Sequence, residues 1–296
     1  MKIEQTLAKY AGSKQPNTEK RLARCYNALS EFVGGKCFGK VTREDAVDFF
    51  LSLKKQGLSD ATVQNTYSLL SGAYRMLTEI GTLKVNPISA ARSFINHRQK
   101  RRVRPTEFIE FMRVARILTS IKLNAGTIRG RRLAVRDRTM IAILFGCGLR
   151  RSEAQALNVN SIHVCKDGLM FVKIEHSKSG KSRRVALNPW TWQFLSHYVS
   201  QRKTDRCYAS DPLFVNYDQE GRAMDRISES TLYRAYRRVT GAAPHSARKT
   251  YATKLIRDGA TRKQVAAELG HASEMMVGIY EAETMIEQSP GRNLAF

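Results

Sequence analysis

Residues 244–280 read PHSARKTYATKLIRDGATRKQVAAELGHASEMMVGIY and carry four side chains suited to phosphate chemistry: His245, Arg248, His271 and Tyr280. An arginine makes paired, charge-assisted hydrogen bonds to phosphate oxygens. A histidine exchanges a proton near neutral pH, and a tyrosine can act as a covalent nucleophile. His245 and Arg248 are three residues apart, so on one helix they share a face. Each of these residues alone is more often an ordinary surface or core residue, but the set predicts a site for a phosphodiester.

Two upstream segments add positive charge to this set. GLRRSE, residues 148–153, follows an apolar run and supplies an arginine. Neighbouring residues on a helix point to different sides, so only one of its two arginines can enter a site. HSKSGK, residues 176–181, lies between two strand-like runs and supplies a lysine at a hairpin turn. The residues themselves leave two choices open: Arg150 or Arg151, and Lys178 or Lys181.

Taken in order, these segments resemble the tyrosine recombinases of the phage integrase family, which are site-specific DNA recombinases. The family motif is an arginine in G-L-R-x-x-E, a lysine on a β-hairpin, H-x-x-R, L-G-H, and a tyrosine nine residues after that histidine. The matching positions are Arg150, Lys178, His245, Arg248, His271 and Tyr280. Glu153, three residues after Arg150, is expected to orient it rather than to act as an acid. The sequence departs from the family at Ala247 and Lys249, which flank Arg248 and bear on packing more than on chemistry.

The resemblance implies a reaction in which Tyr280 attacks a DNA phosphate, a 3′-phosphotyrosyl link forms and a 5′-hydroxyl leaves. The two arginines would neutralise the non-bridging oxygens. His245 would take the tyrosine proton or share an oxygen with the arginines, His271 would donate a hydrogen bond, and Lys178 would protonate the leaving oxygen. The sequence has neither a carboxylate cluster spaced for Mg²⁺ nor a glycine-rich phosphate loop. No metal or other cofactor is therefore expected.

Composition points to the same class of partner. The 296 residues suggest roughly two domains, and a hydrophobic content of 42% is enough for packed cores. Lys and Arg number 50 against 26 Asp and Glu, a net charge of +24 shared by both halves of the chain, which indicates nucleic acid rather than a basic surface without function. The 5 cysteines lack metal-ligand spacing and indicate reduced thiols in the cytoplasm. No apolar run would span a bilayer, and the N-terminus lacks an apolar signal core.

Residues 1–98 show apolar positions at helical spacing, interrupted by glycines. They predict a small helical bundle with an Asn86-Pro87 turn before its last helix, similar to the core-DNA-binding domain of the same recombinases. Residues 99–105 are a basic linker. It is either a solvated joint or, as the net charge favours, a strap over the DNA backbone. The strap would use Arg101, Arg102 and Arg104.

Residues 106–296 predict an α+β tyrosine recombinase catalytic domain with a C-terminal tail. The apolar run in 136–145 predicts a buried helix, and 169–174 with 183–187 predict the strands of a hairpin. A helix over 230–240 carries arginines opposite its apolar face, suited to phosphates or a groove. Further DNA contacts are expected from Lys181, Arg183, Arg234, Arg237 and Arg238. The whole chain is expected to be mainly α with a small antiparallel β-sheet.

The resemblance covers nearly the whole chain and points to the compact two-domain type, as in Xer-type or mobile-element recombinases. The implied partner is a duplex site with inverted half-sites, on which a monomer from free solution joins three further copies as a tetramer. The tail after Tyr280 is expected to pack on the neighbouring subunit, with docking on its own subunit as the alternative. The target site, and whether the task is integration, excision or dimer resolution, stay open.

Two other functions compete with recombination. A type IB topoisomerase shares the chemistry and would relax supercoils without pairing sites, but the short tail and the compact N-terminal bundle favour a recombinase. A non-catalytic DNA-binding accessory protein would not need the tyrosine and the hairpin lysine in register with the other four residues.

Overall fold

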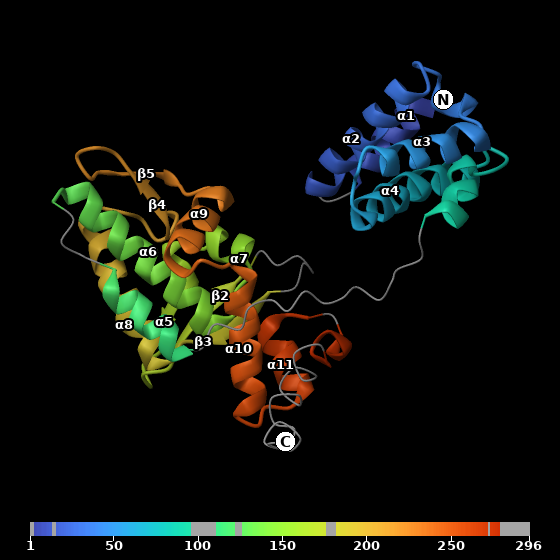
Figure 1. Cartoon of the computed structure of the whole chain (residues 1–296). Coiled ribbons are helices and arrows are strands. Elements are labelled where there is room, and N and C mark those ends of the chain that lie inside the picture. The colour runs from blue at the N-terminus through green and yellow to red at the C-terminus, as the bar shows by residue number, and fades with distance from the viewer. Residues whose placement is uncertain are drawn as a thin grey trace, which may run out of the picture. The chain divides into compact units, whose positions relative to one another are not determined.

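The computed structural model describes residues 3–13, 16–95, 111–121, 126–175, 182–271 and 273–278. The chain forms two compact units, Met1–Arg102 and Val103–Phe296 (Figure 1). The division falls within the basic segment 99–105, which itself lies outside the described residues. Within the described ranges, every helix falls short of the length or the apolar character that a membrane span requires.

In the described part of the N-terminal unit the regular elements are all helices. They are α1 (Ile3–Gly12), α2 (Pro16–Phe32), η1 (Phe38–Lys40), α3 (Arg43–Lys55), α4 (Asp60–Glu79) and η2 (Pro87–Phe94). The apolar stripes of α2, α3 and α4 meet in one core around Leu29, Phe50 and Tyr74. The expected small helical bundle is therefore what these residues form.

Local hydrogen bonds set where two of these helices begin. The Thr42 side chain accepts from the Asp45 amide at 3.0 Å, and the Asp45 carboxylate accepts from the Thr42 amide at 2.9 Å, which closes a capping box at the start of α3. The Asn86 side chain accepts from the Ile88 amide at 3.0 Å, which makes Asn86 the N-cap of the helix that begins at Pro87. The element that follows is a 3₁₀ helix, η2, where the sequence predicted an ordinary last helix.

The second unit is built around the long helix α6 (Ile128–Cys147), whose residues 139–147 are all buried. The predicted helix 136–145 is the inner part of α6, which starts at Ile128 because the Thr127 side chain caps it by accepting from the Gly130 amide. Helices α8, α9 and α10 pack against α6. The helices of the unit are α5 (Phe111–Ser120), α6, α7 (Arg151–Ala156), η3 (Val159–Ser161), α8 (Pro189–Thr204), α9 (Glu229–Thr240), α10 (His245–Arg257), α11 (Arg262–Leu269) and η4 (Glu274–Met276).

Two small antiparallel sheets complete the described part of this unit. One has the order β1 (Ile162–Val164), β2 (Met170–Ile174), β3 (Arg183–Ala186), and the other pairs β4 (Val215–Tyr217) with β5 (Ala223–Arg226). Val172 lies opposite Val185, and both are fully buried. The two predicted hairpin strands are β2 and β3, each within one residue at its ends. The chain is mainly helical with small sheets, as predicted, although the described residues form two sheets rather than one.

Candidate active site

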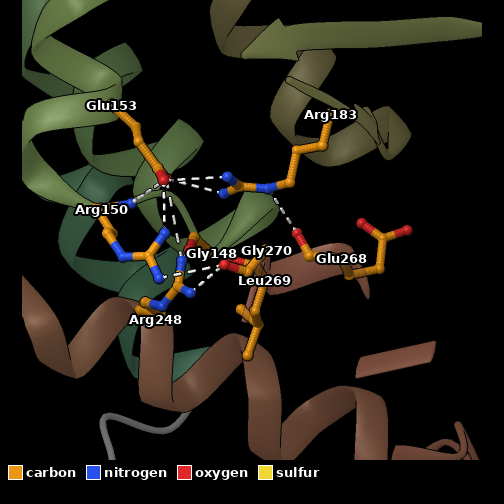
Figure 2. Close-up of polar contacts among 8 residues, drawn as sticks. All are labelled: Gly148, Arg150, Glu153, Arg183, Arg248, Glu268, Leu269 and Gly270. Atoms are coloured by element: carbon orange, nitrogen blue, oxygen red, sulfur yellow. Dashed lines mark hydrogen bonds and ion pairs between the residues drawn. The ribbon is translucent and has the colours of Figure 1, made fainter. Parts of the chain in front are cut away.

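Arg248 joins three segments of the catalytic unit. It lies on the first turn of α10, and its side chain is only 2% exposed. Nη1 donates to the Gly148 carbonyl at 2.8 Å and Nη2 to the Leu269 carbonyl at 2.5 Å (Figure 2). Both carbonyls lie at helix C-termini, where the helix dipole favours a cation. A buried guanidinium is thus held where α6 and α11 end.

Glycine is required at both of these helix ends. Gly148 and Gly270 have φ of 59° and 62°, in the left-handed region that glycine adopts without strain. A Cβ on Gly148 would lie 2.4 Å from Tyr251 Cδ1, and one on Gly270 would lie 2.8 Å from Arg183 Nη1. The left-handed backbone and the close approach of these side chains therefore favour glycine at both positions.

Arg150 of GLRRSE contacts both Glu153 and the end of α11. It is the N-cap of α7, and its Nη1 donates to Glu153 Oε1 at 2.7 Å, while its Nη2 donates to the Gly270 carbonyl at 3.4 Å. Its side chain is 27% exposed, so part of the guanidinium still faces solvent. Arg151 instead pairs with Glu229 at 2.7 Å, although both residues border the same cavity as Arg150. Arg150, rather than Arg151, is therefore the arginine that contacts Glu153 and the end of α11.

Glu153 is the buried anion at the centre of the arginines. Its side chain is 0% exposed. Burial alone would raise the pKa of this carboxyl, but hydrogen bonds from the Arg183 side chain and the Arg150 backbone amide, with the charge of Arg183, outweigh burial and lower the pKa to about 2. The carboxylate is therefore charged at neutral pH. The orienting function expected for Glu153 matches its contacts with Arg150.

Three consecutive carbonyls at the end of α11 accept hydrogen bonds from three different arginines. Glu268 accepts from Arg183 Nε at 2.9 Å, Leu269 from Arg248 and Gly270 from Arg150 (Figure 2). The last carbonyls of a helix lack partners within the helix. The arginines supply those partners, and the chain continues from this point directly into His271.

The two histidines lie among the positive charges of this site. Desolvation of the ring, followed by the charges of Arg248 and Arg150, lowers the pKa of His245. The same causes in the same order lower the pKa of His271 to about 4. Both imidazoles are therefore neutral at physiological pH, and a neutral imidazole has one nitrogen that donates and one that accepts.

Arg150, His245 and Arg248 line one open cavity of about 340 Å³, together with residues of α7 and α9. The structure thus brings three of the six predicted catalytic residues to a single cavity, with His271 at the adjoining end of α11. Ala247 and Lys249, which depart from the family pattern, are both buried, in line with an effect on packing. The other predicted positions lie outside the described residues: Tyr280, Lys178, Lys181, Arg101, Arg102 and Arg104.

Two residues predicted to contact DNA, Arg183 and Arg238, bond to other groups of the protein. Arg183 is turned inward, with a side chain 10% exposed and all three guanidinium nitrogens bonded to Glu153 or Glu268. This corrects the prediction of a DNA contact, because the strand alternation places Arg183 on the same face as buried Val185. Arg238 is 72% exposed but donates to buried Asp137 at 2.7 Å. Arg234 and Arg237 lie exposed on α9, as predicted.

The chain matches a known protein family. The profile of the phage integrase family matches residues 107–287. The chain belongs to the phage integrase family. This integrase-family chain is 30% identical to the tyrosine recombinase XerD of Oceanobacillus iheyensis, over 81% of this chain and 77% of that protein. It is 26% identical to the tyrosine recombinase XerC of Lactobacillus leichmannii, over 90% of this chain and 87% of that protein.

Solved structures of other recombinases share the fold. The Tn1549 transposon integrase in complex with a circular intermediate DNA has a TM-score of 0.69 at 21% identity, covering 97% of this chain and 99% of that one. The XerH site-specific recombinase bound to its palindromic difH substrate has a TM-score of 0.70 at 19% identity, covering 98% and 95%. The predicted resemblance is confirmed, and this integrase-family protein is a tyrosine-type site-specific recombinase. Neither a topoisomerase nor a non-catalytic accessory protein is favoured.

Proposed function

We propose that this recombinase cuts and rejoins duplex DNA through a 3′-phosphotyrosyl intermediate, with Tyr280 as the nucleophile. The observation that carries the proposal is the cavity lined by Arg150, His245 and Arg248, whose two guanidinium groups both pair with the buried carboxylate of Glu153 behind it. Such a pair can meet the two non-bridging oxygens of a phosphodiester as charge builds up in the transition state. Because Arg248 is nearly excluded from water, its attraction for that charge is stronger than in solvent.

The two imidazoles take complementary parts in this proposal. His245 lines the cavity and has a lowered pKa, so its neutral ring can accept the phenolic proton of Tyr280. A free tyrosine has a pKa of about 10 and needs such a base to attack at neutral pH. His271, also neutral, would donate one N–H to the phosphate. Tyr251, which lies beside Gly148, is a poor nucleophile because burial, then the charge of Glu268, raises its pKa.

We expect Lys178 to be the general acid that protonates the leaving 5′-oxygen. Lys178→Ala should cleave normal DNA slowly. It should be largely rescued on a duplex whose 5′-bridging oxygen is replaced by sulfur, because a thiolate leaves without a proton. Single-turnover rates on the two substrates measure this. Equal defects on both would assign Lys178 a purely electrostatic part, and Lys181→Ala serves as the matched control.

The DNA is gripped, in this proposal, by the excess positive charge of both units. The net charge of +24 supports binding to the phosphate backbone. Arg234 and Arg237 are exposed on α9, the helix that also contributes to the cavity wall. The basic linker and Lys181 would add further backbone contacts. The recombinases of the same fold solved with a circular intermediate DNA and with a palindromic substrate support a DNA partner, and the palindromic substrate supports inverted half-sites.

We further propose that four copies assemble on two synapsed sites in the cytoplasm, in the service of a mobile element or of dimer resolution. Deleting residues 289–296 should spare binding of one half-site, weaken cooperative binding to the full site and abolish or deregulate strand exchange. Burying the terminal Leu294 and Phe296 would stabilise a contact by about 1.5–3 kcal/mol each, and a head-to-tail contact closes only as a ring. Gel shifts on half and full sites measure the effect. Normal cooperativity in the truncated protein would leave the tail as a cap on its own subunit.

A covalent-adduct assay tests the proposed function. The wild-type protein is used to select its site from a random pool of duplexes, and the selected duplex is then nicked beside the cut so that the adduct is trapped. A protein–DNA band on a denaturing gel separates an enzyme from a binding protein. Exchange of strands between two such sites separates a recombinase from a topoisomerase.

A further inference from the structure

Arg183 contacts two separate parts of the site with its three guanidinium nitrogens. Nη1 donates to Glu153 Oε1 at 3.0 Å and Nη2 to Glu153 Oε2 at 2.8 Å, a two-pronged pair with a fully buried carboxylate. Nε donates to the Glu268 carbonyl at 2.9 Å (Figure 2). Arg183 is the first residue of β3, so it links the hairpin to α7 and to the end of α11.

The carboxylate that Arg183 holds is shared with both arginines of the cavity. Glu153 also accepts from the Arg150 backbone amide at 2.8 Å and from Arg150 Nη1 at 2.7 Å, and Arg248 Nη1 lies 4.0 Å from Oε2. Without Arg183, a buried anion would lose its two-pronged partner. Arg248 is the next cation in reach, and moving toward Glu153 would take it from the Gly148 and Leu269 carbonyls. Arg150 would close more fully on the same carboxylate, which leaves fewer donors for a phosphate.

The second contact acts on the chain that leads to His271. Arg183 binds the first of three consecutive carbonyls whose other two bind Arg248 and Arg150. A C-terminal carbonyl that loses its donor is left with a buried, unpaired lone pair. The end of α11 would then be free to shift relative to both arginines. Arg183 therefore constrains the two arginines from the carboxylate side and from the carbonyl side.

We propose that Arg183 is a positioning residue, which holds Arg150 and Arg248 in the orientation that meets the phosphate by satisfying Glu153 and fixing the end of α11. It touches neither substrate nor reacting atoms. The proposal rests on the proposed function, since it concerns the arginines of the same site. In this proposal Arg183 positions the two arginines. It does not position Lys178, which precedes β3 in the same hairpin sequence.

The experiment compares full-length variants on the nicked duplex selected by the wild-type protein. Arg183→Gln removes the charge and the two-pronged contact, and we expect adduct formation to slow by about 10- to 100-fold, the effect of a small misplacement of catalytic groups, with the Kd for DNA within about twofold of wild type. Arg183→Lys should recover part of the rate, because one ammonium cannot span both carboxylate oxygens and a carbonyl. Arg184→Gln is the matched control, with the same loss of charge on the neighbouring, exposed position of β3. It should keep the wild-type rate.

Two further measurements decide how Arg183 acts. On the duplex with a sulfur leaving group, the defect of Arg183→Gln should persist; rescue there would overturn the proposal in favour of an action through Lys178. The double variant Glu153→Gln with Arg183→Gln removes both members of the buried pair and so avoids a lone buried charge. It should be no slower than the slower single variant, whereas multiplied defects would mean independent action and would also overturn the proposal.

The fluorescence of Trp190 and Trp192, both in the catalytic unit, checks that each variant is folded. If Arg183→Gln has a much lower Tm than wild type, the rates of adduct formation are compared for the double variant and Arg183→Lys instead. On the same gel, an adduct that forms with the wild-type protein and is absent with Tyr280→Phe establishes the proposed function. A wild-type rate for Arg183→Gln would then count against the positioning part alone.

Discussion

Tyr280→Phe is expected to abolish covalent protein–DNA adducts and to leave binding of the target duplex nearly unchanged. The substitution removes one oxygen, which is the atom that would form the bond to phosphorus, and keeps the aromatic ring. The arginines and histidines proposed to bind the phosphate are unchanged, so binding should persist. Denaturing gels measure the adduct, and gel shifts measure the binding.

Tyr251→Phe is the control for this experiment. Tyr251 lies under Gly148, and its raised pKa makes its phenolate scarce. It should form adducts at close to the wild-type rate. Adducts from Tyr280→Phe that disappear in the double variant Tyr251→Phe with Tyr280→Phe would transfer the nucleophile to Tyr251 and refute the assignment.

Arg150→Ala and Arg248→Ala should each slow adduct formation by about 10²- to 10³-fold, of order 3 kcal/mol for one donor to the developing charge. Neither should be rescued by a sulfur leaving group, because the missing interaction is with the non-bridging oxygens. The two variants should differ in stability. Arg248 is buried and serves the Gly148 and Leu269 carbonyls, which its loss would leave without that donor, whereas Arg150 is partly exposed.

Thermal unfolding followed by tryptophan fluorescence separates these two effects. We expect a clearly lower Tm for Arg248→Ala and a smaller change for Arg150→Ala, because unpaired buried carbonyls cost about 1–3 kcal/mol each. Arg222→Ala, which removes an exposed pair with Asp218 away from the cavity, is the control and should leave both the rate and the Tm close to wild type. Equal Tm values for the Arg248 and Arg150 variants would contradict the structural part assigned to Arg248.

Much of this architecture could be predicted from local sequence signals. The hairpin strands alternate, so β2 and β3 were located within one residue of their ends. The strand β1 has only three residues, too few for a periodic signal. The start of α6 was missed because its first turns are basic and lack an apolar stripe.

The carbonyl partners of the arginines could not be predicted. A backbone acceptor leaves no mark on residue type, and Gly148 and Gly270 suggested only helix ends. Arg183 was misassigned because a basic residue beside a hairpin turn suggests a phosphate contact. The alternation of β3 carried the correcting signal, since it puts Arg183 on the face of Val185, toward the core.

The three main-chain oxygens at the end of α11 bear on how this sequence can drift. A side-chain acceptor can be deleted by one codon change, whereas the carbonyls of residues 268–270 persist whatever side chains those residues carry. Only a change in the path of the chain can withdraw these carbonyls. A substitution of Gly270, whose φ of 62° favours glycine, would be such a change. The guanidinium groups therefore keep their carbonyl acceptors through most substitutions within α11. They lose these acceptors when a substitution changes the residue at which the helix ends.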